Sequence, residues 1–157
     1  MSGLSHVDEA GRARMVDVSD KAVTVRTAAA RGTLTCRPET LELVRAGKAP
    51  KGAVIATAEL AGVMGAKRTA ELVPLCHQLP LTKVEVRIAL DDELPGFRIE
   101  AEVRTNAKTG VEIEALTAVA VAGLTLFDML KGVDRTMVIG GIEVVSKTGG
   151  KSGSWAR

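Results

Sequence analysis

Two stretches of this chain alternate between apolar and polar residues. Every second residue is apolar in 84–90 and again in 97–103, and charged residues fill most of the positions between them. A period of two is typical of a β-strand that buries one face. The connecting sequence, DDELPG, is rich in turn-forming residues. We therefore predict an antiparallel hairpin with one face against the core.

A long apolar segment follows the predicted hairpin. Residues 115–127 contain no charged side chain, and they predict the middle of a helix over about 111–131. Thr109 followed by Glu112 fits a capping box that would open this helix. A helix that is apolar on all sides is buried on all sides. We expect the sheet to cover one side and, because the chain is short, a neighbouring subunit to cover the other.

The N-terminal half of the chain predicts one strand and a first helix. Residues 22–36 suit an extended strand with an interruption near Gly32. Pro38 suits the first position of a helix, and Gly47 marks the point before which that helix is expected to end.

Two more elements complete the expected fold. A second helix should begin after Pro50 and run to about residue 72, with a break at Gly62 or Gly65. A final strand is expected over about 136–146. Together these elements predict an α+β fold, a ferredoxin-like antiparallel sheet with helices packed on one face.

The length of 157 residues favours a single domain over 1–157 that can bury its own core. The two ends lack this regular patterning. We expect flexible segments over about 1–14 and about 147–157, which a ligand could order.

Composition narrows the partners and the compartment. The net charge is only +2, and aromatic residues make up 2% of the chain, so neither a charged nor a stacking surface for nucleic acid is expected. The N-terminus shows no apolar signal segment, and no apolar run approaches the ~20 residues that a membrane helix needs. We expect a cytoplasmic protein with no membrane partner, whose cysteines stay reduced.

One short stretch, VPLCHQLPLTK (73–83), places Cys76 next to His77. Zinc ligation is disfavoured, because the chain has no CxxC or HxxxH spacing. Cys76 fits a small buried residue better than a catalytic thiol. His77 lies between two prolines, and a stiff loop suits a general acid/base. A structural histidine, hydrogen-bonded in the core, explains this stretch equally well.

The predicted long helix carries ionisable residues only near its two ends. Glu112 and Glu114 lie in its first turn, where carboxylates also favour the helix dipole. Asp128 and Lys131 are three residues apart and share one face, which also suits a solvated ion pair. Glu114 and Asp128 are separated by about 21 Å along the helix axis. If both act on one small molecule, the pocket must lie between subunits.

Scattered cations elsewhere give a weaker signal. They are Arg26, Lys51, Lys67, Arg68, Lys147 and Lys151. The segment KTGGKSG (147–153) is similar to a phosphate-binding loop, but it lacks the spacing GxxxxGK[ST] of a P-loop. Each cation taken singly fits solvated surface.

Four strings of residues closely resemble one known family. They are MVDVSDK (15–21), KGAVIATAELAGVMGAKRTAELVPLCHQLPLTKV (51–84), KTGVEIEALTAVAVAGLTLFDMLKGVD (108–134) and KTGGKSG (147–153). The family is that of the cyclic pyranopterin monophosphate synthases, the molybdenum cofactor biosynthesis protein C family. The resemblance runs essentially from end to end without large insertions.

This resemblance implies a fold, a reaction and an assembly. The implied enzyme is a lyase with a ferredoxin-like α+β fold that converts 3',8-cyclo-7,8-dihydro-GTP into cyclic pyranopterin monophosphate and releases pyrophosphate. A radical S-adenosylmethionine enzyme supplies the substrate. The implied assembly is a homohexamer, a trimer of dimers, with its pocket at a subunit interface. No cofactor is implied, and a divalent cation bound with the triphosphate stays an open alternative.

The resemblance also assigns residues. The implied catalytic residues are Asp128, Lys131, His77 and Lys51. The implied substrate-binding residues are Leu75, Cys76, His77, Glu112, Ile113, Glu114, Arg26, Lys67 and Lys147, with Arg26 and Lys67 near the triphosphate. Acids and bases suit the proton transfers of this rearrangement, and cations suit the departing pyrophosphate.

The chain departs from the usual family pattern at four positions. Ile113 replaces a common methionine of similar volume. Gln78 replaces a proline, which could loosen the loop that carries His77. Phe127 and Leu130 replace the frequent tyrosine and cysteine. None of these changes removes a proposed catalytic group.

Two other functions remain open from the residues alone. Ferredoxin-like folds host many activities, so a non-catalytic nucleotide-binding regulatory module is one alternative. A structural oligomer, in which the uncharged helix serves assembly, is the other.

Overall fold

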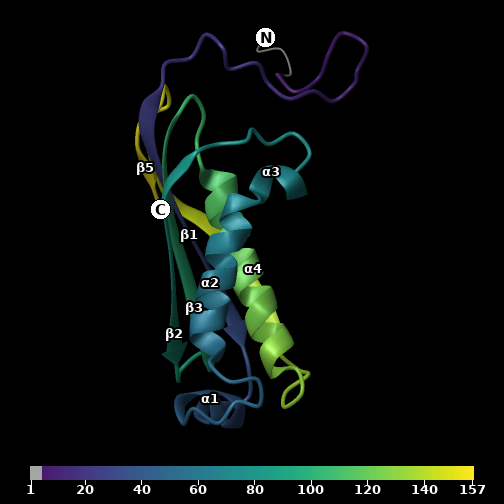
Figure 1. The fold of residues 1–157 in the computed structure, drawn as a ribbon, viewed down its shortest axis with the longest axis vertical. Helices are drawn as coiled ribbons and strands as arrows, with labels where there is room; N and C mark the ends of the chain where they lie inside the picture. The colour runs from purple at the N-terminus through teal and green to yellow at the C-terminus, as the bar shows by residue number, and fades with distance from the viewer. Residues whose placement is uncertain (1–4) are drawn as a thin grey trace.

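Five strands form one antiparallel sheet in the order β2-β3-β1-β4-β5. The computed structural model describes residues 5–157. The strands are β1 (Thr24–Thr35), β2 (Leu81–Asp91), β3 (Gly96–Ala107), β4 (Val138–Thr148) and β5 (Trp155–Ala156). The helices are α1 (Pro38–Arg45), α2 (Val54–Lys67), α3 (Thr69–Leu72) and α4 (Glu112–Leu130). Both long helices lie on one face of the sheet (Figure 1), so the predicted ferredoxin-like α+β fold is confirmed.

The predicted hairpin is formed by β2 and β3. Phe97, Ile99 and Val103 of β3 are fully buried, whereas the intervening Arg98 and Glu100 are exposed. This alternation is the one that the sequence predicted. It places the apolar face of the sheet against the helices.

Strand β1 runs without a break, but its pairing with β4 shifts between Arg31 and Thr33. The expected interruption near Gly32 is therefore an irregularity in pairing and not a gap in the strand. A Cβ atom at Gly32 would lie 2.8 Å from a side-chain carbon of Val119. Glycine at this position lets α4 pack directly against the sheet.

The predicted break in the second helix is wrong. Helix α2 continues through Gly62 and Gly65, and it ends at Lys67 before the short helix α3. A Cβ atom at Gly62 would lie 2.9 Å from the carbonyl oxygen of Ala118, and one at Gly65 would lie 2.7 Å from Val121. These glycines allow close helix packing, which outweighs their low helix propensity.

Helix α4 occupies the predicted segment, but the predicted capping box is absent. The N-cap residue is Val111, and no side chain caps the helix. The Glu112 carboxylate instead forms an ion pair with Lys147 of β4. This ion pair uses the side chain that would have completed the box.

Much of the apolar surface of α4 is covered from within the same chain. The helix packs on β1, β3 and β4 on one side and on α2 on another (Figure 1). Helix α2 of the same chain thus covers much of the side of α4 that we expected a neighbouring subunit to cover. Leu124 of α4 stays exposed, as do Leu60 and Met64 of α2.

The expectation that no apolar run is long enough for a membrane helix needs a correction. By length and composition, α4 is long and apolar enough to cross a membrane. Ala115, Ala118, Ala122 and Leu126 on this helix have no exposed surface. Core helices of this kind meet the same criteria, so the match is weak as a sign of a membrane span.

Within the described residues, the N-terminal segment before β1 and the C-terminal strand β5 lie near the same end of the sheet (Figure 1). Residues 1–4 of the predicted flexible segment, about 1–14, lie outside the described residues. Val7 and Ala13 pair in an isolated bridge. At the other end, β5 pairs with β4 through Lys147 and Trp155.

Candidate active site

The predicted site residues gather in two groups, one at each end of α4. The first group lies at the C-terminal end of α4, close to the loop that precedes α2. The second lies at the N-terminal end of α4, close to the loop that follows α3. Figure 1 shows that α2 and α4 run in opposite directions between these two ends.

The C-terminal group consists of Asp128, Lys131 and Lys51. Lys131 Nζ lies 2.7 Å from one carboxylate oxygen of Asp128, and Lys51 Nζ lies 3.1 Å from the other. The hydrogen bond from Lys131, followed by that from Lys51, lowers the pKa of the Asp128 carboxyl. Asp128 is therefore an ionised acceptor held between two ammonium groups. Its spacing from Lys131 predicted the contact with Lys131, whereas the contact with Lys51 was not predicted.

This group is open to solvent. The side chains of Lys51, Lys131 and Asp128 keep 51%, 55% and 56% of their surface exposed. A buried substrate pocket at this position would need a further surface to cover it.

A buried carboxylate that the sequence analysis did not identify lies just behind the C-terminal group. Asp134 is 1% exposed. It accepts hydrogen bonds from the Arg37 backbone N–H, the Thr40 hydroxyl, and both the backbone N–H and the hydroxyl of Thr136. Asp134 thus ties the start of α1 to the segment that follows Lys131. No local motif points to this role, because its partners lie up to 97 residues away.

The N-terminal group is built around a buried carboxyl. Glu114 is 3% exposed, and its Oε2 has no hydrogen-bond partner among residues 5–157. The Cys76 thiol donates to Glu114 Oε1 across 3.8 Å. Burial raises the pKa of the Glu114 carboxyl above its ordinary value.

Cys76 and His77 approach Glu114 from the loop after α3. Burial, reinforced by the Glu114 charge, raises the pKa of the Cys76 thiol to about 11. A thiol that stays protonated is a poor nucleophile, which agrees with the expectation that Cys76 is not a catalytic thiol. Cys76 is only partly buried, however, and not the buried residue that the sequence predicted. The His77 Nε2 atom lies 2.6 Å from the carbonyl oxygen of Val16.

A hollow of about 770 Å³ opens beside this group, and Arg26, Glu112 and Lys147 line it. Lys147 Nζ lies 2.5 Å from Glu112 Oε1. Arg26 donates to the carbonyl oxygens of Ala107 and Lys108, each across 3.1 Å. Three cations in or near this hollow were not among the predicted site residues: Lys21, Lys108 and Lys151. All three fall inside the strings that carry the family resemblance, which is the signal that could have found them.

The remaining predicted residues lie at the same end of the molecule. Ile113 is 40% exposed in the first turn of α4. Lys67 is the exposed last residue of α2, and Leu75 is partly buried in the loop before His77. Within residues 5–157, no side-chain hydrogen bond or ion pair joins Lys67 to the other predicted residues. Its predicted contact with the triphosphate stays a prediction.

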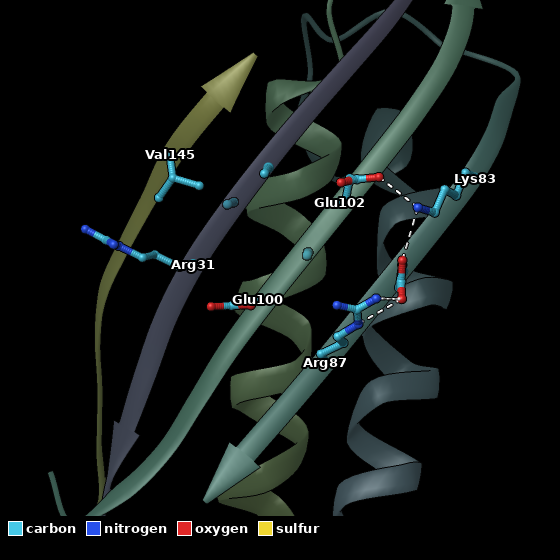
Figure 2. A pocket seen from close by; sticks show the side chains of 10 residues that line it. Arg31, Lys83, Arg87, Glu100, Glu102 and Val145 are labelled. Atoms are coloured by element: carbon cyan, nitrogen blue, oxygen red, sulfur yellow. Dashed lines mark hydrogen bonds and ion pairs between the residues drawn. The ribbon is translucent and has the colours of Figure 1, made fainter. Parts of the chain in front are cut away.

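A separate hollow of about 330 Å³ lies on the open face of the sheet, away from the helices (Figure 2). Most of its charged side chains pair with one another. Lys83 bridges Glu102 at 2.8 Å and Glu85 at 3.1 Å, and Arg87 also contacts Glu85. None of the predicted site residues lines this hollow, so we place the candidate active site at the ends of α4.

Comparison with known proteins shows the family of this chain. The MoaC family model matches residues 15–150. The chain belongs to the MoaC family. Every predicted catalytic and substrate-binding residue of this MoaC-family chain falls inside the matched range.

Relatives match over nearly their whole length. A protein of Thermomicrobium roseum is 59% identical over 100% of this chain and 95% of its own length. A protein of Dinoroseobacter shibae is 58% identical over 98% and 97%, and one of a Nostoc species is 57% identical over 98% and 92%. Each is named cyclic pyranopterin monophosphate synthase.

The MoaC-family chain shows no cluster of metal ligands in its described part. Among residues 5–157, no three or more His, Cys, Asp or Glu side chains are grouped so that they could hold a metal ion.

Proposed function

We propose that this protein is a cytoplasmic lyase of molybdenum cofactor biosynthesis. It converts 3',8-cyclo-7,8-dihydro-GTP into cyclic pyranopterin monophosphate and releases pyrophosphate. The observation that carries the proposal is the identity of 57–59% to relatives of that name over almost the full chain. A radical S-adenosylmethionine enzyme would supply the substrate.

The two ends of α4 suit opposite halves of a proton transfer. Two ammonium groups keep Asp128 ionised, so this carboxylate can accept a proton or stabilise a developing positive charge. Burial raises the pKa of the Glu114 carboxyl, so it holds a proton more readily than Asp128 does and can donate it. Environments that push two carboxyl pKa values apart mark a general base and a general acid. His77, Lys131 and Lys51 can relay further protons in the rearrangement.

The cations beside the N-terminal group suit the triphosphate. Lys21, Arg26, Lys147 and Lys151 line one hollow with Glu112. Positive side chains fixed around a phosphate chain stabilise the charge that builds on departing pyrophosphate. We propose no protein-bound metal. A divalent cation, where one takes part, would be held by the triphosphate oxygens.

The distance between the two groups supports a shared site. Glu114 and Asp128 lie in the same straight helix, about 21 Å apart along its axis. One small molecule cannot contact both in a single chain. We therefore propose a homohexamer, a trimer of dimers, in which the C-terminal group of one chain completes the N-terminal group of another. The half-exposed Asp128, Lys51 and Lys131 are then covered by the partner.

Turnover of the cyclised substrate tests this function. Purified protein is incubated with 3',8-cyclo-7,8-dihydro-GTP, and the product is oxidised to a fluorescent pterin. The expected result is one pterin and one pyrophosphate for each substrate consumed. Binding of the nucleotide without either product would favour the non-catalytic nucleotide-binding module instead.

A further inference from the structure

A segment near the N-terminus passes over His77. We call residues 15–19 the strap. Its Val16 carbonyl oxygen lies 2.6 Å from His77 Nε2, and its Ser19 carbonyl oxygen accepts a hydrogen bond of 2.7 Å from Lys108 Nζ. The strap, His77 and Lys108 together line a hollow of about 410 Å³. Figure 1 shows the N-terminal segment crossing the end of the molecule at which α4 begins.

The contact with Val16 determines which nitrogen of His77 carries a proton. A carbonyl oxygen only accepts hydrogen bonds, so Nε2 must be the donor. In a neutral imidazole the lone pair then resides on Nδ1. Among residues 5–157, no side chain or backbone group hydrogen-bonds to that second nitrogen. Nδ1 is therefore the nitrogen that can take a proton.

The strap is shaped and anchored by groups other than His77. The Asp17 carboxylate accepts hydrogen bonds from the backbone N–H and the hydroxyl of Ser19, at 2.9 and 2.5 Å. Lys108 lies in the loop between β3 and α4, and its carbonyl oxygen accepts a hydrogen bond from Arg26. A continuous path of contacts thus leads from the sheet through Lys108 to the strap and to the imidazole.

We propose that Lys108, acting through the strap, is a positioning residue that holds His77 with Nε2 protonated and Nδ1 free as the base. This inference rests on the proposed function, in which His77 transfers protons. The placement of the imidazole proton can nevertheless be measured without any substrate, so the two can fail separately.

The first test observes the imidazole directly. The chain has two histidines, and the substitution His6→Gln leaves His77 alone in the spectrum. In full-length protein of that background with ¹⁵N-labelled histidine, we expect a protonated Nε2 whose hydrogen exchanges slowly with water. Lys108→Met should abolish the slow exchange, Lys108→Arg should preserve it, and Lys48→Met on the exposed turn after α1 should not change it. A protonated Nδ1, or equally slow exchange in Lys108→Met, overturns the proposal.

The second test separates positioning from substrate binding. Loss of the strap contact should remove part of the 10²–10⁴-fold rate that a positioned acid/base supplies. We expect Lys108→Met to lower kcat about tenfold with KM within about twofold, and Lys108→Arg to recover most of the rate. A rise in KM with kcat unchanged means that Lys108 binds substrate directly, and it overturns the positioning role.

Discussion

Lys51 and Asp128 are 77 positions apart in the chain, yet Lys51 Nζ lies 3.1 Å from a carboxylate oxygen of Asp128. The same ammonium also donates to the Asp128 carbonyl oxygen. The Lys131 ammonium group forms an ion pair with the other carboxylate oxygen of Asp128. The loop before α2 thus supplies the second of the two cations that hold the Asp128 carboxylate at the C-terminal end of α4.

Asp128→Asn and Lys131→Ala should each lower turnover by at least about 10²-fold, because each removes a charged group from the proposed acid/base site. The melting temperature should stay close to that of the wild type, because these side chains are half exposed and exposed ion pairs add little stability. Product yield and thermal melting measure the two effects. Asp92→Asn, in the exposed turn of the β2–β3 hairpin, is the matched control. An undiminished product yield from either variant would remove that residue from the catalytic set.

Mixing two inactive variants should restore activity if the site is shared. His77→Asn alters the N-terminal group, and Asp128→Asn alters the C-terminal group. With random subunit exchange, about a quarter of the shared sites receive an intact group from each chain, so about a quarter of the wild-type rate is expected. Two portions of one variant, mixed in the same way, provide the baseline. Verified exchange without recovery contradicts the shared pocket.

Asp134 should make stability depend on acid pH. Burial raises its pKa, but hydrogen bonds from Arg37, Thr136 and Thr40 lower it more, so the folded pKa lies below the ordinary value. The stabilisation is fully present above the unfolded pKa, about 3.9, and is lost as the pH falls from there through the lowered folded pKa. The free energy of unfolding should therefore decrease as the pH is lowered below about 4.

The variant Asp134→Asn isolates this effect. Its free energy of unfolding at pH 7 should be lower by roughly 1–3 kcal/mol, because buried hydrogen bonds to a charged group are lost. It should also decline less than that of the wild type between pH 4 and pH 2. Denaturant titrations at fixed protein concentration measure both. If the free energy of unfolding declined equally with pH in the two proteins, Asp134 would not be the source of the acid sensitivity.

Gly65→Ala should destabilise the packing of α2 on α4. Its new methyl group would lie 2.7 Å from a side-chain carbon of Val121, so the helices must separate. Overpacking of this kind costs about 1–3 kcal/mol, which exceeds the gain in helix propensity. Gly140→Ala is the control, because a Cβ atom there meets nothing within 4 Å. Equal unfolding midpoints for the two variants would show that close packing does not require this glycine.

Local signals predicted the elements well and failed where distant residues intervened. The alternation around Ile88 and Ile99 and the uncharged run after Glu114 record which faces are buried, so strands and helix appeared where expected. The capping box failed because Lys147, distant in sequence, takes the Glu112 carboxylate. The helix break failed because Gly65 serves contact with Val121 and not chain flexibility.

The candidate site also contains features that local sequence predicted and features that depend on distant residues. The spacing of Asp128 and Lys131 predicted their contact, since residues three apart on a helix share a face. The distance between Glu114 and Asp128 also followed from helix geometry alone. Lys108 and Asp134 were missed as functional groups, because their partners Ser19 and Arg37 lie 89 and 97 positions away.

The sequence by itself determined the strands, the apolar helix and the residue types available for acid/base chemistry, because periodic burial and helix spacing are local properties of the chain. Only the tertiary structure decided which of these residues meet. In the folded protein Lys51 contacts Asp128, the buried Glu114 accepts a hydrogen bond from Cys76, and the Val16 carbonyl oxygen contacts His77. The physical reason is that such contacts, and the protonation states they impose, depend on how the helices and the sheet pack together.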